Sequence, residues 1–454
     1  MTLSTAGHFL VAVIGAGPAG LYATQYLARH GVQVVVFNRD IKPGGLAEYA
    51  IFPSKQKMRQ GLEAQFNRIL SLPKVHYQGN VRIGQSGDIQ LDQLRKVGFQ
   101  AFVVTTGAQH NKWLGLPGED LGGVYQANDI VFHYNRLPER AKMQFQFGNQ
   151  VAILGVGNVM LDILHYLKKT REIREVTAYA RRGPSEVRFD KPTLEPVVDC
   201  FDLTSINEAV GQAAAMAHQV DQDFTDFCLL LKNALEKAER CDSGPRVEIK
   251  FLYSPRRLIG DQNGRVKAIV FEKNRLIKEA GEILSVGTGV VEAFPADTVI
   301  FSIGSSVDTG FGLPVESGHF VTTPKPCFPV DGISFEVYNP DLCATCEDIF
   351  VSGWARLASA GVVGLARKDA ERCARAVLAY LDTLDSHFRI EAGDALKQLP
   401  ERDKKIVNWD DIKKLREVEQ KFATKMGLDS YKFDSNAAML RAIEGSLASS
   451  MGSG

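Results

Sequence analysis

The stretch that decides the fold lies near the N-terminus, where residues 10–20 read LVAVIGAGPAG. Its apolar half predicts a buried β-strand, and the periodic apolar residues of Leu21–Arg29 predict a helix directly after it. Gly15, Gly17 and Gly20 have the G-x-G-x-x-G spacing of a dinucleotide-binding turn. The first glycine makes the tight turn, the second admits a pyrophosphate, and the third lets the helix pack on the strand. The sequence therefore predicts a Rossmann-like domain at this end of the chain.

The next expected strand, Val32–Phe37, is apolar almost throughout, as is typical of a parallel sheet covered on both faces. The residue after such a strand is usually acidic and holds the ribose hydroxyls of the dinucleotide. Here Asn38 takes that place and Arg39 follows it. An amide can still donate and accept hydrogen bonds, so we expect Asn38 to contact the ribose without contributing charge.

The same pattern recurs about 140 residues later. A predicted strand at Val151–Leu154 is followed by Gly155 and Gly157 and then by a helix with periodic apolar residues. Met160 stands where a small third residue is usual, so the argument from close helix–strand packing applies less to this unit. Two such units in series indicate two dinucleotide-binding domains.

The strand expected after the second turn, Glu175–Ala180, ends in Arg181 and Arg182. Two guanidinium groups at this place match a ribose 2′-phosphate in charge and in hydrogen-bonding geometry, whereas an acidic residue would favour NAD. The second site is therefore predicted to bind NADP(H).

Composition sets broad limits. A chain of 454 residues is too long for one ordinary core, so we expect two or three domains, one of which is discontinuous. Lys plus Arg equals Asp plus Glu, at 53 each, which argues against a nucleic-acid partner. There is no apolar run long enough for a membrane span and no visible signal peptide. Seven scattered cysteines favour a reducing cytoplasm, and nine histidines without ligand spacing predict no metal site.

Further elements follow from the same patterns. We expect a strand at Phe102–Thr105 ending at Thr106 and Gly107, a buried strand at 298–304, and a last strand at Ile349–Trp354. Helices are predicted at Val362–Tyr380, Ile412–Met426 and Ala437–Leu447.

Taken together, these residues resemble the adrenodoxin reductase family of ferredoxin–NADP reductases, from Val11 to about Ile443. The resemblance rests on Gly157-Asn158-Val159 with Asp162, on Arg181–Pro184, on Ser352–Trp354, and on Gly361–Gly364 with Arg367–Ala370. It implies an α/β fold of two Rossmann-like dinucleotide-binding domains, with the NADP domain inserted into a discontinuous FAD domain. The expected boundaries are 1–108 for the first part of the FAD domain, 109–305 for the NADP domain, and 306–454 for the second FAD part with a C-terminal helical extension.

The resemblance also implies the site residues. Lys55, Asp162 and Trp354 are the catalytic residues that it implies. Trp354 and the backbone near Gly361 would lie at the junction of nicotinamide and flavin, with Lys55 and Asp162 close by. Lys55 stands where the family usually carries histidine. The FAD-binding set is Gly15, Gly17, Pro18, Ala19, Gly20, Asn38, Arg39, Gly45, Leu46, Thr106, Gly107, Gly353, Trp354, Gly361, Val362 and Val363. The NADP(H)-binding set is Gly155, Gly157, Asn158, Val159, Arg181 and Arg182.

The activity implied by the resemblance is hydride transfer from NADPH to FAD, followed by electron transfer to ferredoxin or another iron–sulfur carrier. The chain has no four-cysteine cluster with ferredoxin spacing, so any such centre belongs to a partner. Basic residues at 168–174 and at 55–59 fit either helix-terminal charge or a docking patch for an acidic carrier. A flavoprotein subunit of a larger complex, similar to the small subunit of glutamate synthase, is an alternative. The oligomeric state stays open.

Cys343 and Cys346 have the spacing of a redox dithiol, so an NADPH-dependent disulfide reductase is the other enzyme alternative. Their position argues against it. The pair precedes the last strand, whose C-terminal end should meet the flavin, so the cysteines are expected at the opposite end.

Overall fold

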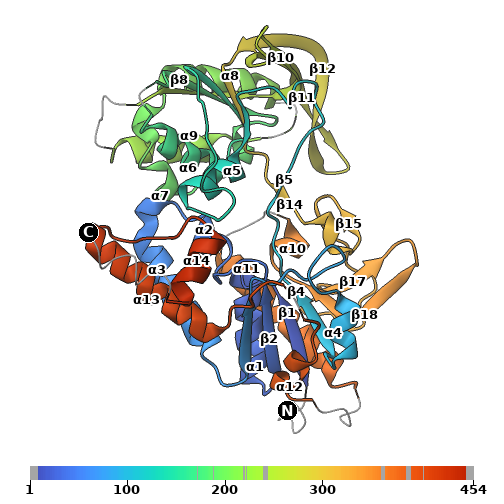
Figure 1. Ribbon diagram of the computed structural model, residues 1–454. Coiled ribbons are helices and arrows are strands. Elements are labelled where there is room, and N and C mark those ends of the chain that lie inside the picture. Colours follow the sequence, from blue (N-terminus) through green and yellow to red (C-terminus); the bar gives the residue numbers. More distant parts are fainter. Residues whose placement is uncertain are drawn as a thin grey trace. The chain divides into compact units, whose positions relative to one another are not determined.

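The structure, a computed structural model, describes residues 9–170, 172–187, 189–217, 220, 222–238, 244–358, 363–384, 390–401 and 403–445. They form two compact units. The first comprises the chain up to His110, Tyr134–Lys142, and the chain from Gly304 onward; the second comprises Asn111–His133 and Met143–Ile303. Both are built on parallel sheets (Figure 1), which confirms the predicted α/β class. The boundaries 1–108, 109–305 and 306–454 stay predictions.

The first unit contains a six-stranded sheet in the order β17-β18-β4-β1-β2-β3. Its strands are β1 (Leu10–Ile14), β2 (Gln33–Asn38), β3 (Val75–Gly79), β4 (Ala101–Val104), β17 (Glu336–Asn339) and β18 (Ala344–Val351). All pairs are parallel except β17 with β18. Since β1 lies between β4 and β2, the Gly-rich turn that follows it emerges at the middle of the sheet.

Side chains of β1 alternate between two cores, as the period of a strand requires. Val11 and Val13 join the cluster on one face, which includes residues of helices α1 and α11. Leu10, Ala12 and Ile14 join the cluster on the other. All five residues of β1 are buried, which explains why the strand is apolar throughout.

Helices cover the sheet of the first unit and extend beyond it (Figure 1). They are α1 (Pro18–Arg29), α2 (Leu46–Tyr49), α3 (Gln56–Leu70), α4 (Leu91–Lys96), α10 (Trp354–Leu357), α11 (Val363–Leu381), α12 (Ala392–Lys397), α13 (Trp409–Met426) and α14 (Asn436–Ile443). A capping box between Asn408 and Asp411 begins α13, and left-handed Gly427 ends it. The C-terminal helices lie beside early ones, since Arg416 of α13 contacts Glu63 of α3 at 3.0 Å.

The second unit contains a parallel sheet in the order β6-β13-β7-β8-β9 and an antiparallel sheet in the order β10-β11-β12. Its strands are β6 (Val124–Gln126), β7 (Gln150–Leu154), β8 (Glu175–Ala180), β9 (Arg246–Phe251), β10 (Tyr253–Gly260), β11 (Val266–Glu279), β12 (Glu282–Pro295) and β13 (Thr298–Phe301). Its helices are α5 (Ala127–Tyr134), α6 (Asn158–Leu167), α7 (Lys191–Leu194), α8 (Leu203–Ala217) and α9 (Thr225–Leu235). Tyr179 stacks on Phe271, with ring centroids 4.1 Å apart, and so joins the two sheets.

Short strands complete the list: β5 (His110–Asn111), β14 (Ser305–Ser306), β15 (Val315–Glu316) and β16 (His319–Phe320). The first predicted helix begins at Pro18 rather than Leu21, because proline is favoured at the first helical position. The last strand ends at Val351 rather than Trp354, because Gly353 with φ +66° turns the chain and Trp354 begins α10.

Candidate functional site

The first Gly-rich turn has a reason for each of its glycines. A Cβ on Gly15, whose φ is +107°, would lie 2.4 Å from the Thr105 carbonyl oxygen. One on Gly20 would lie 1.9 Å from the Gly15 carbonyl oxygen. One on Gly17 would meet no heavy atom within 4 Å. The first and third glycines are thus required by the protein itself, whereas Gly17 keeps open the space that a pyrophosphate needs.

The helix after this turn presents unused donors to that space. Gly17 is the N-cap of α1 and provides no side-chain cap, and Pro18 follows as the first helical residue. The remaining N–H groups of the first turn, with the positive end of the helix dipole, favour a bound phosphate. This geometry fits the expected dinucleotide.

Asn38 is placed at this turn, but its amide is used by the protein. Its Oδ1 accepts a hydrogen bond from the Ala16 N–H at 3.1 Å, and its Nδ2 donates to the Asp40 and Lys42 carbonyls and to the Tyr77 hydroxyl. The side chain is buried. Asn38 therefore stabilises the turn through hydrogen bonds within the protein, and its direct contact with a ribose stays a prediction. Arg39 is half-exposed and bonds Gln109 at 2.8 Å.

Two further segments of the predicted site lie against the turn. The Gly44 N–H donates to the Ala16 carbonyl at 2.8 Å, and a Cβ on Gly45 would lie 3.0 Å from Gly17 Cα. Leu46 then begins α2. After β4, the Thr106 hydroxyl is buried and has no hydrogen-bond partner among the described residues. An orphaned hydroxyl beside the turn fits a group of the bound dinucleotide.

Gly107 (φ +69°) adds open space after Thr106, since a Cβ there would meet nothing within 4 Å. At the end of β18, a Cβ on Gly353 would lie 2.6 Å from Ala19 Cβ, so only glycine permits this approach to α1. Trp354 follows and packs against the apolar cluster on the side of Leu10. The structure thus brings Gly353 close to Ala19 of the first turn, whereas the place of Trp354 at the flavin stays a prediction.

Asp369 of α11 holds the Gly353 turn, and the sequence reading gave it no role. Its carboxylate accepts hydrogen bonds from the Ser352 hydroxyl at 2.8 Å and the Gly353 N–H at 2.7 Å, and it pairs with Arg356. Both Ser352 and Asp369 are buried. A buried carboxylate with these partners fixes the backbone from which Trp354 projects. Val363 begins α11, whereas Gly361 and Val362 lie outside the described residues.

The second Gly-rich turn repeats the first in the other unit. Gly155 also has φ +107°, and a Cβ there would lie 2.3 Å from the Ser302 carbonyl oxygen. Gly157 again has open space, is the N-cap of α6 and provides no side-chain cap. Met160 is fully buried. The large residue at the third position is therefore accommodated inside the unit.

Asn158, the first residue of α6, makes reciprocal hydrogen bonds with Asp190. Its Nδ2 donates to the Asp190 carboxylate at 2.7 Å, and its Oδ1 accepts from the Asp190 N–H at 2.9 Å. Val159 beside it is exposed. Asn158 thus ties the start of α6 to the start of α7, and its contact with a nucleotide stays a prediction.

The two arginines differ in availability. Arg181 is exposed, and its carbonyl accepts hydrogen bonds from Asn274 Nδ2 and Ser285 Oγ, which anchors its backbone to β11 and β12. Arg182 is half-buried and pairs with Glu186 at 3.2 Å. Arg181 is therefore the more available cation for a 2′-phosphate.

The remaining predicted site residues are placed on helices. Lys55 ends the 3₁₀ turn Pro53–Lys55 and precedes α3, and Asp162 lies on α6. Both are half-buried. They belong to different units, so their proximity stays a prediction.

The thiol alternative loses support. β18 begins at Ala344 rather than Ile349, so Cys346 lies within the strand instead of before it, and Cys343 directly precedes it. Both still lie toward the end of the strand away from Gly353, as predicted. Cys343 lies in the exposed turn between β17 and β18, and both thiols are free. Burial, with Asp348, raises the pKa of Cys346 and so lowers its thiolate fraction.

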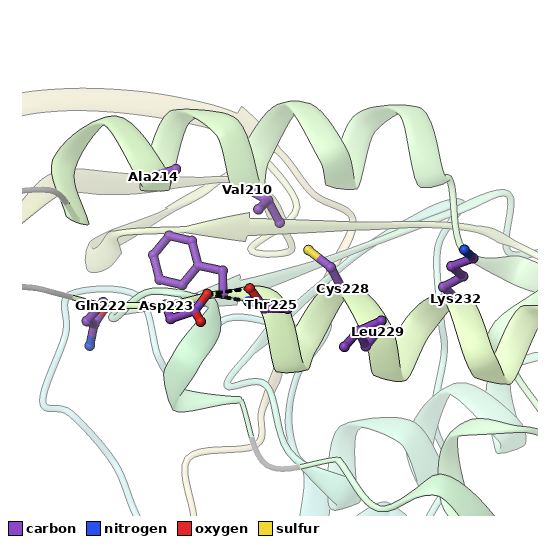
Figure 2. A pocket seen from close by; sticks show the side chains of 9 residues that line it. Val210, Ala214, Gln222, Asp223, Thr225, Cys228, Leu229 and Lys232 are labelled. Carbon is purple, nitrogen blue, oxygen red and sulfur yellow. Dashed lines mark hydrogen bonds between the residues drawn. The ribbon is translucent and has the colours of Figure 1, made fainter.

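A cavity of about 480 Å³ lies between α8 and α9 in the second unit, and Figure 2 shows its lining, which includes Val210, Cys228 and Lys232. Asp223 accepts hydrogen bonds from the Thr225 N–H and hydroxyl there, so its carboxylate is used within the protein. The cavity contains none of the predicted site residues.

The described residues offer neither a metal site nor a membrane-spanning helix. Among them, no group of histidine, cysteine and acidic side chains is arranged to hold a metal ion. Their helices include none with the length and apolar character needed to cross a membrane.

A buried charge cluster, which we call the ion quartet, consists of Lys42, Glu48, Glu419 and Lys432. Lys42 Nζ lies 2.8 Å from both Glu48 Oε1 and Glu419 Oε2, and Lys432 Nζ lies 3.0 Å from Glu48 Oε1. Burial opposes charge on Lys42, but Glu419 and Glu48 outweigh it and raise its pKa. Burial also opposes charge on Glu48, but the two lysines outweigh it and lower the pKa of Glu48 to about 2. Sequence reasoning missed the quartet because its members are up to 390 positions apart, as Lys42 and Lys432 are.

Comparisons with known proteins agree with this geometry. The family model described as pyridine nucleotide-disulphide oxidoreductase matches residues 9–194. The chain is 28% identical over 407 residues to the mitochondrial NADPH:adrenodoxin oxidoreductase of Salvelinus fontinalis, covering 81% of this chain and 77% of that protein. It is 26% identical over 479 residues to the NADPH-ferredoxin reductase FprA of Mycobacterium leprae, covering 96% and 98%.

A solved structure of Mycobacterium tuberculosis FprA in complex with NADPH has a similar fold, with a TM-score of 0.79 at 23% identity, covering 96% of this chain and 99% of that one. The resemblance to the adrenodoxin reductase family that the sequence motifs indicate is confirmed by these relatives.

Proposed function

Proceeding from its similarity to NADPH:adrenodoxin oxidoreductases and NADPH-ferredoxin reductases, we propose that this protein is an FAD-dependent oxidoreductase that passes electrons from NADPH to a ferredoxin-type iron–sulfur protein. The observation that carries the proposal is the pair of matching turns, in which Gly17 and Gly157 each keep an open approach to an uncapped helix N-terminus. Bound FAD would supply the redox chemistry, accepting a hydride equivalent and giving up electrons singly.

The chain's own residues would bind and orient the two dinucleotides. The turn of Gly15 and Gly17 would hold the FAD pyrophosphate, and the orphaned Thr106 hydroxyl offers a further hydrogen bond. Arg181 would bind the 2′-phosphate of NADPH, with Arg182 as a second cation. Trp354, whose turn Asp369 holds in place, is the proposed residue at the flavin.

The test begins with the purified protein. We expect a flavin absorption spectrum, anaerobic bleaching by NADPH, and much slower bleaching by NADH at the same concentration. NADPH oxidation is then compared with ferredoxin, quinone and disulfide acceptors, and ferredoxin should be reduced fastest. A protein that neither contains nor takes up FAD contradicts the proposal. Faster turnover with a disulfide, lost in Cys343→Ser, would instead favour the dithiol alternative.

The partner is proposed to be an acidic iron–sulfur protein that meets the basic segment Lys55–Arg59. Lys57 is exposed there. The other basic segment is less available, because Lys168 is bound to the Asp199 carboxylate at 2.7 Å. Electron transfer should slow steeply with added salt, and Lys57→Glu should slow it at low salt while NADPH bleaching stays unchanged. A rate independent of salt would contradict this docking mode.

A reducing, cytoplasmic location is part of the proposal. It is supported by the cysteines in the described part of the chain, all six of which are free thiols.

A further inference from the structure

The ion quartet joins the C-terminal helical segment to the proposed FAD site. Lys42 follows β2, and Glu48 lies in α2, whereas Glu419 lies in α13 and Lys432 follows that helix. Glu419 also accepts a hydrogen bond from the Phe433 N–H at 3.3 Å, and Lys432 donates to the Glu48 carbonyl at 2.5 Å. The four charges balance, and all four side chains are about nine-tenths buried or more.

Two short paths lead from the quartet to the Gly-rich turn. In the first, the Lys42 carbonyl accepts a hydrogen bond from Asn38 Nδ2 at 3.0 Å, and Asn38 Oδ1 accepts from the Ala16 N–H. In the second, Glu48 belongs to the four-residue helix α2, which begins beside Gly17 at Gly45. Both paths consist of hydrogen bonds or direct packing, so Lys42 and Glu48 are each connected to the turn through a short series of contacts.

A buried ion cluster is poor at adding net stability, because taking its charges out of water costs about as much as their attraction returns. It does specify position, because each charge can be satisfied at only one place. Here it fixes where the C-terminal segment meets the loop that follows β2. Lys432 is the member of the quartet that loses its charge most easily, since burial lowers its pKa to about 8 although Glu48 opposes that shift.

We propose that Glu419 and Lys432 are positioning residues for the flavin: through Lys42 and Glu48 they hold the Lys42–Tyr49 segment against the first Gly-rich turn, so that the C-terminal segment retains bound FAD. The inference rests on the proposed function in that it takes FAD as the ligand of this turn. It assigns the helical extension a task in cofactor retention that is separate from electron transfer.

The test measures FAD release from the holoprotein at 25 °C and pH 7, as the rise of flavin fluorescence after dilution. Glu419→Gln should release FAD at least 10-fold faster than the unmodified protein. Glu417→Gln is the matched control, because Glu417 lies on the same helix and is exposed; its release rate should stay within about twofold. Equal release rates for Glu419→Gln and the unmodified protein would overturn the proposal.

A charge-balanced double variant, Lys42→Met with Glu419→Leu, separates positioning from stability. Replacing a buried ion pair by apolar residues restores stability in other proteins, so the melting temperature of the apoprotein should recover relative to Glu419→Gln. FAD release should remain at least 10-fold faster than from the unmodified protein, because the ion pair between positions 42 and 419 is absent. Recovery of both properties would show a purely structural role and overturn the proposal.

If Glu419→Gln does not fold, Lys432→Gln serves instead, since it removes the weakest charge; release at the unmodified rate would again overturn the inference. The two proposals fail differently. A protein that binds no FAD contradicts the proposed function, whereas one that binds FAD and releases it equally fast in every variant contradicts only the role of the quartet.

Discussion

The two Gly-rich turns share a backbone and differ in what surrounds it. Gly15 and Gly155 have the same φ of +107°, and each lies against the carbonyl of the strand that returns beside it, at Thr105 or Ser302. The third position differs, since Gly20 has no room for a Cβ whereas Met160 is fully buried in the same role. The backbone geometry is therefore set by the first glycine and the neighbouring strand, and the helix can approach closely or be held off by a large side chain.

The strands that follow the turns differ as well. Asn38 is buried and its amide is used within the protein, whereas Arg181 is exposed and its carbonyl is bound by Asn274 Nδ2. The first turn is thus held by internal contacts, while the second leaves its recognition side chain available to a ligand.

The largest effect is expected from Gly20→Ala. Its Cβ would overlap the Gly15 carbonyl oxygen, so the helix must move and the turn must open, at a cost of more than about 3 kcal/mol. We expect purified Gly20→Ala to contain no flavin and to unfold at lower urea concentration. Gly17→Ala is the control: its Cβ enters open space, so the apoprotein should keep its stability while FAD binding weakens. Normal flavin content in Gly20→Ala would contradict the inference that position 20, unlike Met160 in the second turn, has no room for a side chain.

Arg181→Ala should come next. Loss of a charge-assisted hydrogen bond costs about 1.5–3 kcal/mol, which corresponds to roughly 10- to 100-fold weaker NADPH binding. Titration of the flavin absorbance with NADP⁺ measures the change, and NADH-dependent bleaching should be unaltered. Arg182→Ala should cost less, because that side chain already pairs with Glu186. The reverse order of the two variants would contradict the assignment.

Asn38→Asp tests the contrast between the two strand ends. An acidic residue at this place usually favours the ribose, yet here a carboxylate could not donate to the Asp40 and Lys42 carbonyls. We expect a loss of about 1–3 kcal/mol in unfolding free energy and weaker FAD binding. Calorimetry and FAD titration of the apoprotein give both values. Tighter FAD binding would show that Asn38 acts mainly on the ligand.

The smallest effect is expected from Glu186→Gln, which releases Arg182 from its partner. This pair is partly exposed, and surface ion pairs are worth about 0.2–1 kcal/mol, so NADPH binding should tighten by up to roughly fivefold. The same flavin titration measures it, with NADH as the reference ligand. Weaker NADPH binding would mean that Glu186 orients Arg182 rather than competing for it.

Much of the fold could be predicted because the decisive signals are local. The strands Leu10–Ile14 and Glu175–Ala180 have the predicted bounds, since each is a short β-forming run next to a sharp turn. The burial of Met160 could not be predicted, because a sequence shows that a residue is large but not whether the fold has room for it. Asn38 was placed correctly at the turn, but only coordinates show that its hydrogen bonds are internal.

The missed residues share one cause. Asp369 acts on Gly353 across the contact between a helix start and a strand end, and Glu419 acts on Lys42 across 377 positions of chain. Neither residue has a local motif, and charged residues in amphipathic helices such as α11 and α13 ordinarily face water. Only the fold shows which of them are buried.

The first unit has a consequence for how the protein is made. Its core on the side of α1 unites residues from Phe9 to Val103 with residues from Phe335 to Ile443. During synthesis, a ribosome releases every residue of the second unit before this core can close. The second unit can therefore fold while the first still waits for its final helices. Strands such as β1 and β2 are exposed to aggregation during that delay. Because Glu419 of α13 is proposed to retain FAD, bound FAD would begin to protect these strands only after α13 has been synthesised.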